Sequence, residues 1–149
     1  DVDLEYELSL SNVDKPALEF PETVDRLFQF IGGDLIWLTE SATFAEKSRL
    51  FPKTTFVVGV DTIIRVADPK YHSDQDSHRQ AIQTIVAANC SFLVFGRQLD
   101  QDGMESAAFY ELEDLALPAE LKEICRQVPA ASFRCDISST ELRASELEE

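Results

Sequence analysis

Residues 55–61 read TFVVGVD, and this stretch decides the fold. The run of β-branched and aromatic side chains before Gly59 is typical of a strand that is buried on both faces. Such strands belong to parallel sheets, in which helices cover the faces. Gly59 ends the run, and Asp61 follows two residues later. In open α/β sheets, ligands bind beyond the carboxyl ends of the strands, so these two residues form the first candidate site.

Outward from this strand, the spacing of apolar residues alternates between the period of a strand and the period of a helix. Strands are expected over residues 4–10, 34–38, 91–95, 107–112 and 131–136. Helices are expected over residues 16–31, 41–50, 61–66, 78–89 and 118–128. This alternation predicts an α/β protein with a parallel sheet and helices on both of its faces.

Length and composition set the class of protein. The 149 residues fit one domain, and 44% of them are apolar. The net charge is −15, because 28 acidic residues face 13 basic ones, and such a surface repels nucleic acids. The chain has no apolar run long enough to span a membrane and no apolar segment of a secretory signal near its acidic first residues. We expect no nucleic-acid partner and no membrane association.

The cysteines point to a reducing compartment. Cys90, Cys125 and Cys135 form no C-x-x-C pair, and each lies beside apolar residues. A sparse, odd set without metal-ligand spacing predicts reduced and mostly buried thiols in a cytoplasmic protein.

Two strand ends carry candidate ligand-binding residues. Gly59 leaves room for a ligand near the backbone, and Asp61 offers an acceptor for ribose hydroxyls; alternatively, Gly59 makes a turn and Asp61 caps a short helix. Arg97 follows the strand at residues 91–95 and is suited to a phosphate, but an arginine in a solvated loop fits the same pattern.

The third candidate lies at residues 137–143, which read ISSTELR. Ser138 and Glu141 have the spacing of a capping box, which marks the start of a helix. The free amides at a helix start attract anions, and the hydroxyls of Ser139 and Thr140 and the guanidinium of Arg143 would add to a phosphate-binding corner. An ordinary capped helix is the alternative interpretation.

A short polar segment contains the only two histidines. Residues 72–78 read HSDQDSH, which supplies competent metal ligands but no ordered spacing for them. We interpret the segment as a solvated loop in which Asp76 or Ser77 caps the next helix, and we assign no metal site.

Together, these motifs carry a resemblance. A strand ending in Gly-x-Asp, a later strand followed by an arginine and a late Ile-Ser-Ser-Thr-x-Leu-Arg resemble the nucleotidyltransferase superfamily. That superfamily includes the nicotinamide mononucleotide adenylyltransferases and the cytidylyltransferase-like domains. The stretches SNVDKP (residues 11–16), TFAEK (43–47) and FVVGVDT (56–62) are similar to the cytidylyltransferase-like branch.

The resemblance implies a Rossmann-like fold over residues 1–149 and a site for a nucleoside triphosphate, ATP or CTP, with Mg²⁺. It assigns the triphosphate to Ser138, Ser139, Thr140 and Arg143, the nucleoside to Gly59 and Asp61, and a looser match to Arg97. The implied reaction transfers the nucleotidyl group to a small phosphorylated substrate, mainly by positioning and by charge stabilisation.

One departure from the family pattern is large. The family opens with a glycine-rich strand and a His-x-Gly-His motif, whereas neither His72 nor His78 is followed by x-Gly-His, and no glycine precedes Gly32. We therefore name no catalytic residue and expect transfer only if that N-terminal motif is supplied, as in a longer chain. The alternative is a catalytically inactive nucleotide-binding regulatory module or a protein-interaction domain. A sheet without the family's first, central strand would expose apolar edges, so we expect a homo-oligomer or pairing with the missing N-terminal segment.

Overall fold

The computed structural model describes residues 3–14, 16–30, 32–72, 74–99 and 108–135. These ranges form a mixed α/β protein with parallel sheets, which confirms the expected class. The strands are β1 (Tyr6–Ser9), β2 (Ile36–Thr39), β3 (Thr55–Gly59), β4 (Ser91–Phe95), β5 (Arg97–Leu99), β6 (Ala108–Tyr110) and β7 (Cys125–Val128). The α-helices are α1 (Phe20–Phe28), α2 (Phe44–Leu50), α3 (Val60–Ala67), α4 (Gln75–Ala87) and α5 (Ala119–Glu123), with the short 3₁₀ helices η1 (Pro69–Tyr71) and η2 (Leu112–Asp114).

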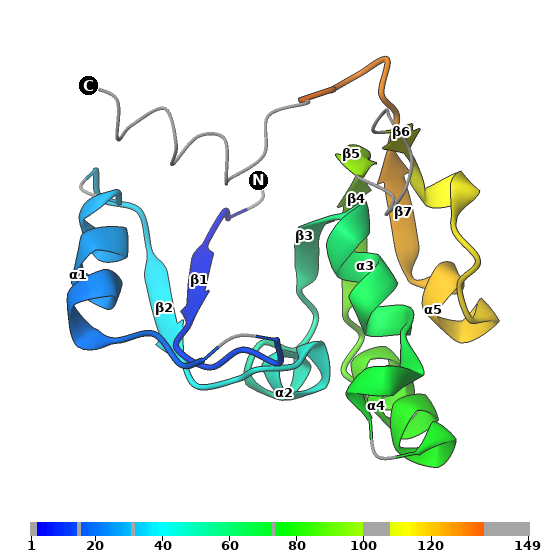
Figure 1. Cartoon of the computed structure of the whole chain (residues 1–149), viewed down its shortest axis with the longest axis horizontal. Coiled ribbons are helices and arrows are strands. Elements are labelled where there is room, and N and C mark those ends of the chain that lie inside the picture. The colour runs from blue at the N-terminus through cyan, green and yellow to red at the C-terminus, as the bar shows by residue number, and fades with distance from the viewer. Residues whose placement is uncertain (1–2, 15, 31, 73, 100–107, 136–149) are drawn as a thin grey trace.

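The parallel strands fall into two separate sheets. In the larger sheet, β4 lies between β3 and β7, and Gly59 is opposite Phe95 at one end of the ladder. The smaller sheet pairs β1 with β2, and β5 and β6 form an antiparallel hairpin. Figure 1 shows β1, β2 and α1 on one side of the molecule, the larger sheet with α3, α4 and α5 on the other, and α2 between them. Within the described residues, no ladder joins β1 to β3, so the single sheet expected from the sequence is divided there.

The core lies on one face of the larger sheet. Phe92 and Val94 of β4 are fully buried against Ile63 of α3, Ile85 of α4 and Leu121 of α5. On the opposite face, the side chain of Val57 is 56% exposed. Helices on both faces were expected, whereas the core cluster of the described residues gathers on the face that carries Phe92.

The C-terminal expectations were wrong in two places. The helix expected over residues 118–128 ends with α5 at Glu123, and the chain continues directly as β7. β7 pairs with β4, with Cys125 opposite Phe92 and Val128 opposite Phe95. Pairing with a buried strand outweighs the helical spacing of a few apolar residues, since β propensity depends on such tertiary context. Residues 131–135, expected as the last strand, form a turn and irregular chain.

Helix starts follow capping chemistry. The sequence left Ser41 or Thr43 as the start of α2, and the structure has Thr43 in a capping box with Glu46. The helix expected from Pro16 begins instead at Phe20, with Pro21 in its first turn. The N-cap of α4 is Asp74, which accepts a hydrogen bond from the Ser77 amide, so the assignment to Asp76 or Ser77 was wrong.

Several large apolar side chains are exposed, and they include Trp37 at 45%, Phe20, Phe28 and Phe133. Of the thiols, Cys90 is buried, Cys125 is half-buried and Cys135 is exposed, so the expectation of mostly buried cysteines fails for Cys135. None of the helices in the described residues has the length and apolar character that crossing a bilayer requires.

Candidate functional site

The first candidate pair lies at the junction of β3 and α3. Gly59 ends β3 and is the N-cap of α3, and Asp61 lies in the first turn of that helix. The Asp61 carboxylate lies close to Gly59. A Cβ atom added at Gly59 would lie only 2.5 Å from Asp61 Oδ1. The space beside Gly59 is therefore filled by this carboxylate, whereas the sequence suggested that a ligand would enter it.

Arg97 joins this pair. It follows Gly96 directly after β4, and β4 lies beside β3 with Phe95 opposite Gly59. The parallel pairing therefore brings the two carboxyl ends together, and Nη1 of Arg97 lies 3.6 Å from Oδ2 of Asp61. The structure thus brings Arg97 to Gly59 and Asp61, which lie more than 30 positions earlier in the sequence.

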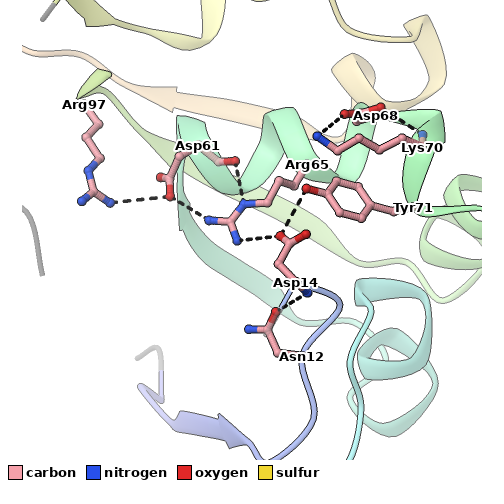
Figure 2. Close-up of polar contacts among 8 residues, drawn as sticks. All are labelled: Asn12, Asp14, Asp61, Arg65, Asp68, Lys70, Tyr71 and Arg97. Atoms are coloured by element: carbon pink, nitrogen blue, oxygen red, sulfur yellow. Dashed lines mark hydrogen bonds and ion pairs between the residues drawn. The ribbon is translucent and has the colours of Figure 1, made fainter. Parts of the chain in front are cut away.

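The sequence interpretation missed the rest of this polar network, which Figure 2 shows. Arg65 lies one helical turn after Asp61, and its Nη2 lies 3.1 Å from Asp61 Oδ2. Its Nη1 lies 3.4 Å from Oδ2 of Asp14, in the loop after β1. Tyr71 donates its hydroxyl to the same Asp14 oxygen at 3.2 Å, and the Asp14 amide donates to Asn12 Oδ1 at 2.9 Å. The i,i+4 spacing of Asp61 and Arg65 was a signal for that pair, whereas no local signal marks Asp14.

Positive and negative groups alternate along the network, in the order Arg97, Asp61, Arg65 and Asp14. The four side chains are between 26% and 42% exposed, so each pair adds only about 0.2–1 kcal/mol to stability. Their main effect is to orient one another. They also connect the loop after β1 to the carboxyl edge of the larger sheet.

Charged groups next to this network titrate away from their usual ranges. The pKa of Asp68 is lowered, because its carboxylate accepts hydrogen bonds from the Lys70 amide and ammonium. The pKa of Lys70 is raised by the same carboxylate and then by Tyr71. The pKa of His72 is lowered, first by burial and then by the charge of His78.

Gly96 has a structural role beside the site. A Cβ atom there would lie 2.7 Å from the Phe109 ring and 2.9 Å from the Tyr110 carbonyl oxygen. The missing side chain therefore lets the β5–β6 hairpin fold close to the end of β4. That fold sets the position of Arg97 at the start of β5.

The third candidate, formed by Ser138, Ser139, Thr140 and Arg143, lies outside the described residues. The last described residues lie near the end of β4, where Phe95 is opposite Gly59. The rings of Phe133 and Phe95 are 5.2 Å apart, and the Arg134 guanidinium lies 4.3 Å from the centre of the Phe109 ring.

The histidine segment is more ordered than a solvated loop. His78 is buried in α4, and its Nε2 lies 3.2 Å from the carbonyl oxygen of Val66. The ring of His72 lies 5.0 Å from that of His78. In the described residues, no three or more His, Cys, Asp or Glu side chains are grouped so that they could hold a metal ion.

Comparison with protein-family models, with curated proteins and with solved structures gives no match for this chain.

Proposed function

We propose that this chain is a nucleotidyltransferase-like domain that binds ATP or CTP at the carboxyl edge of β3 and β4. The observation that carries the proposal is the meeting of Asp61 and Arg97, 3.6 Å apart, beyond two adjacent parallel strands. This is the edge at which open α/β sheets bind their ligands, and it resembles the site of Rossmann-like folds. The overall Rossmann-like arrangement is part of the same proposal.

The chemistry of the corner suits a nucleotide. Oδ1 of Asp61 has no hydrogen-bond partner among the described residues, so it is available to a ribose hydroxyl. Arg97 offers further donors to a phosphate, and the amides at the start of α3 favour an anion. Cys135 is the last described residue, three positions before Ser138. In the proposal, Ser138, Ser139, Thr140 and Arg143 complete the triphosphate site.

Mg²⁺ fits this corner only as a partner of the nucleotide. Proteins usually bind Mg²⁺ through one or two carboxylates together with substrate phosphates. Here Asp61 supplies one carboxylate. Its Oδ2 atom already faces Arg65 and Arg97, and Oδ2 of Asp14 faces Arg65. An ion that arrives with the triphosphate would offset the charge of the phosphates.

Nucleotide-dependent stabilisation tests the proposal. With a dissociation constant of about 0.1 mM, 1 mM ATP or CTP with Mg²⁺ adds about 1.4 kcal/mol, which raises Tm by about 3–6 °C. Arg97→Ala and Arg143→Ala should each weaken binding by about 1.5–3 kcal/mol, as expected for a charged hydrogen bond. Arg79→Ala is the matched control, because Arg79 is exposed on α4 and pairs with Glu120. No stabilisation by either nucleotide at millimolar concentration would remove the nucleotide assignment.

A protein-interaction module is the second candidate, and it is favoured by the outer edge of β3, which pairs with no strand in the described residues. The Ser91 amide of β4 donates to the Thr54 carbonyl oxygen, so the backbone groups of Thr54 and of every second residue after it face β4. The backbone groups of the residues between them, Thr55 and Val57, therefore face the outer edge of β3. A second copy that presents the same edge would make a two-fold symmetric pair. Sedimentation at high salt would show a dimer that Val57→Lys disrupts, and a monomer at high protein concentration would rule out this pairing.

A further inference from the structure

A cavity of about 230 Å³ lies between the loop after β1 and the helices that cover the larger sheet. It does not include Asp61 or Arg97, the corner proposed above as the nucleotide site. The loop after β1 and the start of α2 form one wall, and α3, η1 and α4 form the other. Arg65 belongs to both places, since it lines the cavity and pairs with Asp61. The cavity therefore lies beside the candidate nucleotide site and shares Arg65 with it.

Charge is distributed unevenly around this cavity. The cationic Lys47 and Arg65 line it together with His72, and none of the described lining residues is acidic, although the chain carries 28 acidic residues. Glu7 lies behind the wall, where it pairs with Lys47 at 2.5 Å. The lysine ammonium has three donors, and this pair uses one of them. Two cationic side chains therefore line the cavity, and each is paired with a carboxylate outside the lining: Lys47 with Glu7, and Arg65 with Asp14 and Asp61.

The rest of the wall divides into a polar and an apolar part. Hydroxyl and amide groups come from Ser11, Asn12 and Tyr71, and the Asn12, Arg65 and Tyr71 side chains gather around Asp14 (Figure 2). The apolar floor consists of Phe44, Val66, Ala81, Ile82 and Ile85. Binding pockets typically combine an apolar lining with a few polar groups that fix orientation.

The volume limits the size of an occupant. An apolar cavity of about 150 Å³ holds one benzene molecule, so about 230 Å³ admits one ring and a small substituent but not a nucleoside triphosphate. We propose that the cavity is a binding site for a small organic anion, a single apolar ring that carries one carboxylate or phosphate group. The ring lies on the floor formed by α4, and the anionic group faces Lys47 and Arg65. This inference does not rest on nucleotide binding at the Asp61–Arg97 corner.

Benzoate, phenyl phosphate and the neutral benzamide are the probes. Benzoate or phenyl phosphate should bind the whole chain with a dissociation constant on the order of 1 mM, and benzamide should bind at least about 10-fold more weakly. His72 and His78 are the only histidines, so their ring protons give two assignable NMR signals. The His72 signal should shift on titration with an anionic probe, because His72 lines the cavity.

Two variants separate this site from nonspecific binding. Ala81→Leu fills the floor and should weaken benzoate binding by at least about 10-fold, whereas Ala87→Leu on the exposed end of α4 should leave it unchanged. Unfolding curves of both variants establish that they are folded. Equal binding of benzoate and benzamide to the unaltered chain would overturn the proposal, and so would an unmoved His72 signal. Tight binding of phenyl phosphate but not benzoate would assign the site to phosphorylated ligands.

Discussion

Replacing each of the two strand-end glycines by alanine gives opposite expected results, and the difference tests the candidate site. Gly59 has φ −86° and ψ 163°, which an alanine adopts without strain. The only close contact of the new Cβ is with Asp61 Oδ1 at 2.5 Å. At Gly96, the new Cβ would meet the Phe109 ring at 2.7 Å and the Tyr110 carbonyl oxygen at 2.9 Å. The first obstacle is a side chain that can rotate, and the second includes backbone.

The magnitudes follow from these contacts. Cβ atoms essentially never approach other atoms within 3.0 Å, so Gly59→Ala must move the Asp61 carboxylate by at least 0.5 Å, the difference between 3.0 and 2.5 Å. This move weakens ion pairs worth about 0.2–1 kcal/mol each, while alanine removes about 0.4–1 kcal/mol of unfolded-state freedom. The two effects nearly cancel. Gly96→Ala has no such relief, and we expect it to destabilise the fold by about 1–3 kcal/mol.

Urea unfolding and nucleotide titration of both variants measure the difference. Gly59→Ala should keep the unfolding free energy within about 1 kcal/mol of the unaltered chain and lose at least about 10-fold in nucleotide affinity, because Asp61 leaves its position. Gly96→Ala should unfold at lower urea. If Gly59→Ala bound nucleotide as tightly as the unaltered chain, the position of Asp61 would not matter for binding, and the reasoning about this corner would be wrong.

Three further predictions concern the rest of the chain. The side chains of Glu7 and Lys47 form an ion pair and are only 22% and 13% exposed. Lys47→Met leaves the Glu7 carboxylate without its partner and should lower the unfolding free energy by about 2–3 kcal/mol, and adding Glu7→Gln should restore at least about 1 kcal/mol. Additive losses of the two substitutions in urea unfolding would contradict this coupling. The pKa of His72 is lower in the folded than in the unfolded chain, so acidification through its ordinary value of 6.5 favours unfolding. The His72→Gln variant should therefore lose less unfolding free energy than the unaltered chain between about pH 7.5 and about pH 5.5. Burial raises the pKa of the Cys125 thiol to about 11, so iodoacetamide at about pH 8 should label the exposed Cys135 at least about 100-fold faster, and equal labelling by mass spectrometry would refute the burial of Cys125.

Local sequence signals predicted the central elements well. The apolar runs that became β3 and β4 were identified with nearly correct bounds, because β-branched and aromatic residues favour strands. Burial on both faces was expected for β3, but none of its residues is fully buried. The capping box of Thr43 and Glu46 is equally local, since both hydrogen bonds lie within four residues. The C-terminal part was predicted poorly, because β7 exists only through its pairing with β4.

The candidate site shows the same division. Gly59, Asp61 and Arg97 were chosen as candidates by the rule that ligands bind beyond strand ends, which needs only the strands to be recognised, and the structure brings them together. Asp14 and Tyr71 were missed, because they reach the network from the loop after β1 and from η1. Their sequence neighbours give no sign of a partner on α3.

The sequence by itself determined the type of most elements before residue 96, because apolar periodicity, capping residues and glycine positions act within a few residues. It also determined the acidic character of the chain and the types of side chain at the strand ends. Only the tertiary structure decided which strands pair, that two separate sheets form in the described residues, and that Lys47 and Arg65 line one cavity. Those outcomes depend on contacts between distant segments, whose energies come from packing and pairing that no local pattern contains.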